Sequence, residues 1–454
     1  MLAKDWNLGI KETNLRRFLP YVLAGLLAAA IMVGWNVAFA QGDPPLQEVD
    51  DPATHLGNLT TMVAAFLVFF MQAGFAFLGA GLIRSKSTVN YMTKSFMDFA
   101  IASLSFWAFG FALMMGTSAA GIAGTDNFFL LSGGSDWQVY VDWMFQMVFA
   151  GTAATIVAGT VAERTKTQAY FAYSFLIGAI IYPLYGHWVW GGGWLGSLDA
   201  IGLPAAADYA GSGVVHAVGG FVALAGAAVV GPRMGKFNAD GSANDLRGHN
   251  VPFVIIGTFI LFFGWFGFNI NSGSSIGLNA INTLLAGATG AVVALYAQLI
   301  RTGKADILMS CNGALAGLVG ITAPVAHVDP WAAVVIGAIA APIMMISVSV
   351  IEKVFKIDDP VGAVSVHGTC GLWGLLAVGI FANGNNDVNG LVGGDGLQIV
   401  SQLISMGVVL AWALATGFLM FLVLKVSMGV RLSPEEEEMG VDASEHGIVA
   451  YPEG

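Results

Sequence analysis

Long apolar runs separated by short polar stretches dominate this chain of 454 residues. Each run is long enough for at least one helix of about 20 residues, the length that spans a bilayer. The runs lack the alternating pattern of about 10 residues that marks the strands of an outer-membrane barrel. Only 10% of the residues are charged, against roughly 25% in a soluble domain. The pattern therefore predicts an all-α integral membrane protein.

The basic residues set the expected topology. Beyond residue 40, every lysine and arginine falls into one of six clusters, and the positive-inside rule places all six in the cytoplasm. Five intervals between clusters each accommodate two spans, and one more span connects an external Gln41 to Arg84. We therefore expect eleven transmembrane helices, with the N-terminus outside and the C-terminus inside. The clusters are Arg84–Lys94, Arg164–Lys166, Arg233–Arg247, Arg301–Lys304, Lys353–Lys356 and Lys425–Arg431.

The N-terminal segment has the pattern of a secretory leader. Arg16 and Arg17 precede an apolar stretch, and Ala38-Phe39-Ala40 fits an A-x-A cleavage site. The apolar stretch is also long enough to span, so an uncleaved anchor is the alternative. We expect a cleaved signal peptide at 1–40, an eleven-helix membrane domain at 41–430 and a cytoplasmic tail at 431–454.

Two stretches share the pattern D-x2-G-x3-V-H followed by x3-G. DYAGSGVVH runs from Asp208 to His216, and DPVGAVSVH runs from Asp359 to His367. In the expected topology they begin spans five and ten, which run in opposite directions. This predicts an inverted 5+5 repeat plus one extra helix at about 397–424, with a site near the midplane.

Ionisable side chains inside a membrane span are costly and usually face the interior of the bundle. His216 and His367 could therefore line a narrow pore for a small hydrogen-bonding molecule or relay protons. The alternative is a pair of packing histidines that join helices. A metal site would need more ligands, so we expect no metal. Asp208 and Asp359 lie where carboxylates cap helix N-termini, which predicts structural support.

Aromatic residues supply another signal. An aromatic belt at the membrane interface is one interpretation. The other is a vestibule for a small cation, which an indole face stabilises by about 0.5–2 kcal/mol. Three segments reach the outer face in the expected topology: FQMVFAG with Phe145 and Phe149, YGHWVWGGGW with Trp190, and GWFGFNINSGSS with Phe268, Asn269 and Ser272.

Nine motifs together resemble the ammonium transporter (Amt/Mep/Rh) family, and Trp190 with Ser272 favours its bacterial Amt branch. The resemblance implies the ammonium-transporter fold, a homotrimer and one pore per subunit. The motifs, in order, are GLIRSK, FQMVFAG, VAERTK, HWVWGGGW, DYAGSGVVH, GWFGFNINSGSS, CNGALAGLVGITA, DDPVGAVSVHGTCG and RLSPEEEEMGVDASEHGIVAYPE.

The resemblance also implies a role for each site residue. His216 and His367 match the twin histidines of the pore, and Phe149 with Phe268 match two stacked rings that close its outer end. Trp190, Ser272 and Phe149 match the site that recruits ammonium. Asp208 matches the acidic residue that supports this site. Some members carry a further Asp where this chain has Gly362, so that carboxylate's role does not carry over.

The implied activity is recruitment of NH4+, its deprotonation and conduction of NH3, with or without a relayed proton. An ammonium sensor (transceptor) and a passive NH3 gas channel of the Rh type are the alternatives. Methylammonium is a candidate substrate analogue, and the acidic tail resembles a regulatory C-terminus that meets PII signal proteins, although a disordered tail is also possible from its charge. We expect a bacterial inner-membrane protein of nitrogen metabolism that is not an enzyme, without cofactor or nucleic-acid partner.

Overall fold

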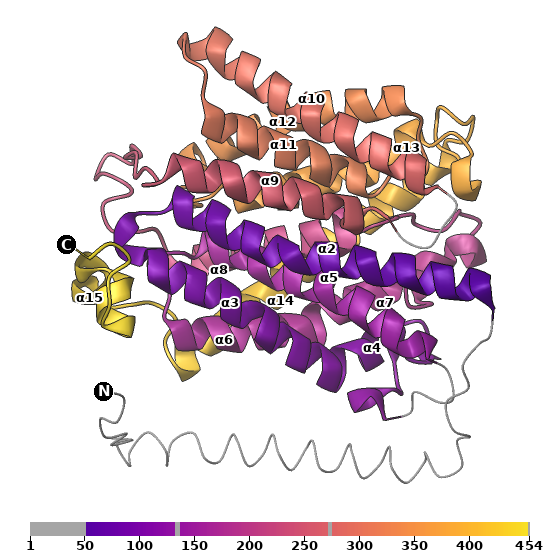
Figure 1. Ribbon diagram of the computed structural model, residues 1–454, viewed down its shortest axis with the longest axis horizontal. Helices are drawn as coiled ribbons and strands as arrows, with labels where there is room; N and C mark the ends of the chain where they lie inside the picture. The colour runs from indigo at the N-terminus through magenta and orange to yellow at the C-terminus, as the bar shows by residue number, and fades with distance from the viewer. Residues whose placement is uncertain (1–50, 132–136, 271–274, 453–454) are drawn as a thin grey trace.

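The computed structural model describes residues 51–131, 137–270 and 275–452. Within these residues, ten helices are long and apolar enough to cross a membrane, and Ile307–Thr322 is a shorter apolar helix. These eleven helices lie side by side in one bundle (Figure 1). The expected eleven-span architecture is therefore confirmed, whereas the expected leader at 1–40 lies outside the described residues.

The first half of the chain forms five spans. Three of them contain a π-helical turn, and the turn in the fourth span ends two residues before Pro183, which cannot donate a backbone hydrogen bond. The spans are α2 (Pro52–Leu82); η1 (Ser85–Ser87) with α3 (Thr88–Ser105), η2 (Phe106–Gly110) and α4 (Phe111–Met115); α5 (Gln138–Thr160); α6 (Thr167–Leu176) with η4 (Ile177–Ile181) and α7 (Tyr182–Val189); and η6 (Ser212–Ala217) with α8 (Val218–Val230).

The second half repeats this order in the opposite direction. Its spans are α9 (Val251–Phe268), α10 (Ile276–Thr302), α11 (Ile307–Thr322), α12 (Pro330–Lys353) and η7 (Val364–Thr369) with α13 (Cys370–Phe381). The eleventh span is α14 (Leu397–Ser427), followed by α15 (Pro434–Met439) and η9 (Asp442–His446). The connections contain η3 (Phe128–Leu130), η5 (Trp194–Ile201), η8 (Asn385–Asp387) and a two-stranded sheet of β1 (Ser118–Ala119) and β2 (Ala123–Gly124).

Small residues allow the two halves to approach closely. A Cβ atom on Gly257 of α9 would lie 2.3 Å from the backbone nitrogen of Leu78 in α2, so only glycine fits there. The long helix α14 packs along the first half, where a Cβ on Gly417 would lie 3.1 Å from the Cα of Val222. Such close contacts between backbones are how membrane helices associate without a hydrophobic driving force.

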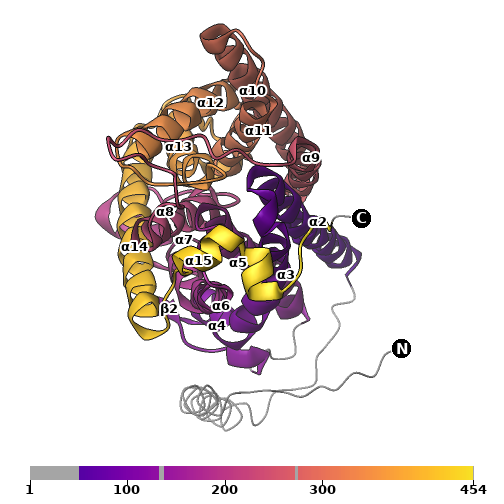
Figure 2. The same cartoon turned by 90° about the vertical axis from the view of Figure 1, so that its left-hand side faces the viewer.

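Helix α15 lies at one end of the bundle (Figure 2), and contacts between the basic clusters and the segment around α15 bring the clusters to the same end. We call this end the tail face. Arg84 pairs with Glu163, and the backbone nitrogen of Lys166 donates to the carbonyl of Val430. One cavity at this face is lined by residues of two further clusters, including Arg233 and Lys304, and Lys356 of the remaining cluster donates to the carbonyl oxygen of Gly241 at 2.6 Å. The expected grouping of basic residues is therefore present.

A buried ionic cluster joins the two halves at the tail face. Arg233 forms a bidentate pair with Asp358 at 2.8 and 3.0 Å and also contacts Glu163 at 2.5 Å. Arg164 is fully buried and donates to three backbone carbonyls, including that of Asp358 at 2.8 Å. Burial lowers the pKa of Arg164 to about 10. Burial alone would raise the pKa of Asp358, but Arg164 and Arg233 lower it to about 2.

The acidic tail is folded against the bundle rather than extended. Ser433 and Glu436 form a capping box that starts α15. Glu437 is 2% exposed and accepts hydrogen bonds from the backbone nitrogen of Met234 at 2.6 Å and from Arg431 at 2.8 Å. Asp442 caps the start of α3, where it accepts from the backbone nitrogen of Asn90 at 2.8 Å. Within the described residues, the tail is therefore an ordered part of the same subunit.

Candidate functional site

The two repeated motifs begin with the same backbone arrangement. Gly211 has φ of 109° and Gly362 has φ of 76°, a left-handed conformation that glycine adopts readily. These residues are the glycines of the D-x2-G pattern. In each copy the turn at the glycine allows the preceding aspartate to reach the amides at the start of the span.

The two aspartates differ in how their oxygens are used. The carboxylate of Asp208 accepts four backbone hydrogen bonds of 2.8–2.9 Å, from residues 211 to 214. Asp359 accepts one hydrogen bond of regular geometry from the described residues, from the backbone nitrogen of Val364 at 2.8 Å, while the Thr160 hydroxyl and the Ala363 amide lie beside its carboxylate in less regular geometry. Burial raises the pKa of both carboxyls, and the amide hydrogen bonds offset only part of this increase. Only Asp208 is a fully satisfied cap.

Each motif continues into a π-helical turn that carries its histidine, η6 for His216 and η7 for His367. The histidines therefore lie about one turn into their spans. A Cβ on Gly220, the last glycine of the first motif, would lie 2.2 Å from the backbone nitrogen of Gly368. Its counterpart Gly371 would meet the carbonyl oxygen of Ser212 at 2.4 Å. These glycines let the two broken helices cross next to the histidines.

The crossing places the two imidazole rings together. The Nδ1 atoms of His216 and His367 lie 3.2 Å apart, and the ring centroids are 5.2 Å apart with an interplanar angle of 23°. The rings are 0% and 4% exposed. One Nδ1 must donate and the other accept, so the contact holds a single proton. The Nε2 of His216 has no partner within the described chain.

Aromatic rings of α9 continue the stack beyond His216. Trp265 and Phe268 lie 5.2 and 5.0 Å from the His216 ring, at interplanar angles of 21° and 19°. Trp265 is fully buried and donates its indole N–H to Thr322 at 3.0 Å. This packing fixes the plane of His216 from the side opposite His367.

Phe149 and Phe268 meet immediately outside the histidine pair. Their centroids are 4.6 Å apart and the rings are perpendicular, with an interplanar angle of 87°. The pair is thus in edge-to-face contact rather than stacked, an arrangement that the ring quadrupole favours. Both side chains are 2% exposed or less. The two rings therefore lie between the His216 ring and the cavity that Phe149 and Phe268 also line.

A cavity of about 200 Å³ lies on the outer side of these rings. Trp190 forms one wall, and its indole N–H donates to the carbonyl oxygen of Asp208 at 2.7 Å. Asp208 therefore orients the indole through its backbone while its carboxylate holds the helix start. The remaining lining residues are Phe145, Gln146, Phe149, Tyr209, Ala210, Phe268 and Ile270.

Two residues beside the outer cavity and the histidine pair, Gln146 and Trp265, were not expected from the sequence. Gln146 lines the cavity, and its buried Oε1 has no hydrogen-bond partner among the described residues. Trp265 supports His216; it lies three residues before Phe268 and thus on the same helix face, which the helical period could have indicated. Ser272, expected in the recruitment site, lies outside the described residues.

A model of the Ammonium Transporter Family matches residues 59–451. The chain belongs to this family. Ammonium transporter Amt2 of Archaeoglobus fulgidus is 49% identical over 446 residues, covering 94% of this chain and 95% of that protein. Ammonium transporter 1 member 3 of Solanum lycopersicum is 38% identical over 424 residues, covering 86% and 92%.

Solved structures agree with this membership in the ammonium transporter family. A protein named Sensor Amt Protein superposes with a TM-score of 0.80 at 39% identity, covering 86% of this chain and 98% of that chain. Mep2 of Saccharomyces cerevisiae superposes with a TM-score of 0.74 at 27% identity, covering 84% and 88%. The chain therefore has the fold of the ammonium transporters, a family of membrane transport proteins and not of enzymes.

Proposed function

We propose that this protein recruits NH4+ at the outer cavity, removes its proton near the Phe149–Phe268 pair and conducts NH3 past His216 and His367. The observation that carries the proposal is the sequence of environments along one line. An aromatic cavity is followed by two closed rings and then by a dry, hydrogen-bonding histidine pair.

The outer cavity suits a small cation. The Trp190 indole and the Phe149 ring offer π faces, and each such face stabilises a monovalent cation by about 0.5–2 kcal/mol. The free Oε1 of Gln146 adds a carbonyl oxygen that can accept a hydrogen bond from ammonium. We assign Ser272 to the same site as a further proposal.

The contact between Phe149 and Phe268 favours a substrate that can become neutral by losing a proton. Moving an unpaired cation into a buried apolar passage costs its hydration, a penalty of several kcal/mol or more. Sodium and potassium cannot avoid that penalty, whereas ammonium can lose a proton and pass as neutral NH3. The imidazoles then offer both a donor and an acceptor to NH3. The shared proton between their Nδ1 atoms also supplies a first element of a proton relay.

The proposal includes the setting of the transporter. We assign the tail face to the cytoplasm and the outer cavity to the exterior of a bacterial inner membrane, because the basic clusters gather at the tail face. We further propose a cleaved signal peptide at 1–40, a homotrimer, and a PII protein as partner of the tail at 431–454. Native mass spectrometry of the full-length protein tests the trimer directly.

Sensing is the second candidate function, favoured by the likeness to a protein named Sensor Amt Protein. A sensor would bind ammonium at the same cavity without needing flux. A passive NH3 channel would conduct in proportion to NH3, not NH4+, as the pH is varied. Both alternatives predict the absence of ammonium-evoked current.

The test is charge movement in proteoliposomes that contain the full-length protein. A pulse of external ammonium should evoke an inward current that saturates with the NH4+ concentration, and methylammonium should compete. Sodium and potassium at the same concentrations should evoke none. Ammonium binding without current would favour the sensor, and swelling or pH change that follows NH3 would favour the gas channel.

A further inference from the structure

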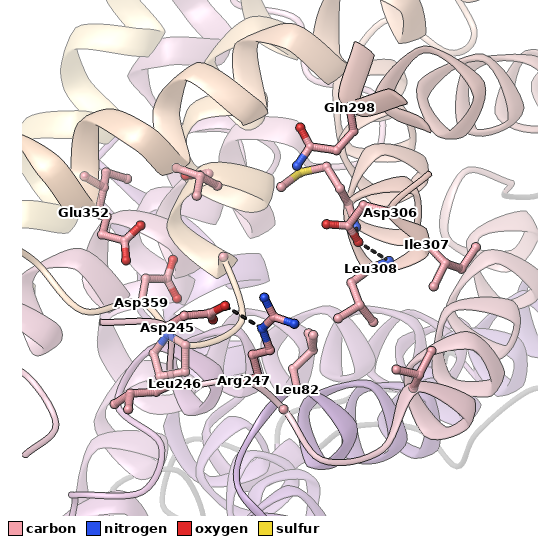
Figure 3. Close-up of a pocket in the computed structure, with 18 of the residues that line it drawn as sticks. Leu82, Asp245, Leu246, Arg247, Gln298, Asp306, Ile307, Leu308, Glu352 and Asp359 are labelled. Carbon is pink, nitrogen blue, oxygen red and sulfur yellow. Dashed lines mark hydrogen bonds and ion pairs between the residues drawn. The ribbon is translucent and has the colours of Figure 1, made fainter. Parts of the chain in front are cut away.

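A second cavity, of about 670 Å³, opens at the tail face below the histidine pair. Figure 3 shows Asp245, Glu352 and Asp359 on one side of it, with Gln298 and Asp306 across the opening. The lining also includes Ser365, two residues before His367 on the same π-helical turn. The cavity thus reaches the segment that carries the second histidine.

Most carboxylates of this cavity already have partners. Asp245 pairs with Arg247 at 2.5 Å, and Glu352 pairs with Lys236. Asp306 caps α11 by accepting hydrogen bonds from the backbone nitrogens of residues 308 and 309 at 3.0 and 3.2 Å. Asp359 has no ion pair with any described residue of the chain. Among the described residues, no cationic side chain pairs with the Asp359 carboxylate, and a single backbone amide donates to it in regular geometry.

Three oxygens, of Asp359, of Ser365 in the same cavity lining and of Thr160 beside the Asp359 carboxylate, make no hydrogen bond of regular geometry with the described residues. They are the Oδ1 of Asp359, the Oγ of Ser365 and the Oγ1 of Thr160. Ser365 is 1% exposed and Thr160 is 0% exposed. The Thr160 hydroxyl lies next to the Asp359 carboxylate without making a hydrogen bond of regular geometry. An unpaired buried polar atom costs about 1–3 kcal/mol, so a bound species that contacts these oxygens would be stabilised.

The repeat makes this arrangement informative. At the equivalent position, each carboxylate oxygen of Asp208 accepts two backbone hydrogen bonds and is not available to a ligand. Asp359 uses one oxygen as a cap, and its other oxygen has only the Thr160 hydroxyl and the Ala363 amide as neighbours, in less regular geometry. Because the fold can saturate a carboxylate at this position, the Oδ1 of Asp359 is not required by the helix start.

We propose that the tail-face cavity contains a binding site for a monovalent cation of the size of ammonium, with the Oδ1 of Asp359 and the Oγ of Ser365 among its ligands. That ammonium is the natural occupant rests on the proposed function. Burial raises the pKa of Asp359, no cationic side chain of the described residues is paired with it, and a bound cation would favour its ionised form. The site would hold ammonium at the inner mouth before release.

Binding can be tested with thallous ion, a monovalent cation close to ammonium in size. Crystals of the full-length protein soaked in thallium acetate should show an anomalous peak bordering Asp359 and Ser365. The peak should vanish in Asp359→Asn and persist in Asp245→Asn, a matched carboxylate of the same cavity that is already paired with Arg247. The absence of an anomalous peak at this site in the wild type would overturn the inference.

Transport supplies an independent readout, measured from each side of an oriented bilayer. A hydrogen bond to a charged group contributes about 1.5–3 kcal/mol, so Asp359→Asn should raise the half-saturating ammonium concentration about tenfold or more from the tail side. The value from the outer side should stay unchanged. Ser365→Ala keeps the Asp359 cap and should raise the tail-side value about fivefold.

Controls separate this site from the proposed function. Asp245→Asn should leave both half-saturating concentrations at their wild-type values. Equal values for Ser365→Ala and wild type from the tail side would contradict the inference, as would equal shifts from both sides. A wild type that gives no ammonium current would contradict the proposed function, while the thallium peak would still decide on the cation site.

Discussion

His216 and His367 are separated by 151 residues, yet their Nδ1 atoms lie 3.2 Å apart at the crossing of two broken helices. One Nδ1 donates and the other accepts, so the contact contains a single proton and both imidazoles can be neutral. Adding a second proton at this contact would oppose two N–H groups in a buried place. This geometry supports the proposal that a neutral molecule passes the histidines and that the cation is selected at the aromatic rings beside them.

The first prediction concerns the indole wall of the outer cavity. Trp190→Leu removes a π face worth about 0.5–2 kcal/mol to a cation, so the half-saturating external ammonium concentration should rise about twofold to thirtyfold. Trp188→Leu is the matched control, because the Trp188 indole donates to the carbonyl of Ile122 and does not line the cavity. Identical saturation curves for Trp190→Leu and wild type would rule out this role of the indole.

The second prediction concerns the saturated cap. Asp208→Asn replaces one acceptor oxygen by an NH2 group that faces backbone N–H donors, so at least one of the two amide pairs is lost. Hydrogen bonds to charged groups contribute about 1.5–3 kcal/mol each, and the thermal transition in detergent should fall accordingly. The loss should also weaken ammonium recruitment, because Trp190 donates to the Asp208 carbonyl.

Asp329→Asn is the control for this prediction. Asp329 stands at the N-cap of α12, where its side chain makes no capping hydrogen bond. Its variant should keep the wild-type transition temperature and saturation curve. A variant of Asp208 that is as stable as the wild type would show that the four amide bonds contribute little.

The third prediction concerns the buried ionic cluster and its pH dependence. The pKa of Asp358 falls from 3.8 to about 2 on folding. The stabilisation is therefore fully present above about pH 4 and is lost as the pH falls through about 2, because the unfolded state then binds the proton first. The pKa difference corresponds to roughly 2 kcal/mol.

Arg233→Ala tests this cluster. It leaves the buried Asp358 carboxylate without its side-chain partner, while Glu163 keeps Arg84, and should cost about 3–5 kcal/mol. Thermal unfolding followed from pH 7 down to about pH 2 should show a smaller acid-induced loss of stability in the variant than in the wild type. Arg247→Ala is the control, since Arg247 and its partner Asp245 are exposed and such pairs contribute at most about 1 kcal/mol. Parallel pH profiles for Arg233→Ala and wild type would contradict the assignment.

The fourth prediction concerns the docked tail. Glu437→Ala removes the acceptor for Met234 and the partner of Arg431, which leaves Arg431 without its ion pair. Breaking a buried pair costs about 3 kcal/mol or more, so amide exchange in residues 434–446 should accelerate about 100-fold. Glu438→Ala, at an exposed neighbouring position, should leave exchange unchanged. Equal exchange in both variants would show that Glu437 does not hold the tail.

Much of the fold follows from the sequence because charge and hydrophobicity act along the whole chain. The six basic clusters gave the number of spans, and the repeated Asp-x7-His pattern gave the inverted repeat and the meeting of His216 with His367. Of the glycines in that pattern, Gly211 adopts a positive φ, and Gly220 lets its helix approach the neighbouring backbone closely. These are local requirements that a motif records directly.

Other features depend on packing that no local pattern records. The π-helical turns at the histidines arise where broken helices cross, and the perpendicular contact of Phe149 with Phe268 depends on neighbouring rings. The different use of Asp208 and Asp359 is also invisible in two matching motifs, because it depends on which amides each carboxylate reaches. Gln146 joined the site only through its position beside the aromatic cavity.

The central claim is that ammonium crosses as NH3 past the histidine pair while its proton follows separately. The most direct measurement is the ammonium-evoked current in proteoliposomes, with wild type beside the double variant His216→Leu/His367→Leu. We predict a saturating current for the wild type and its loss in the folded double variant, because leucine can relay no proton. An undiminished current in the double variant, with ion selectivity intact, would contradict the account.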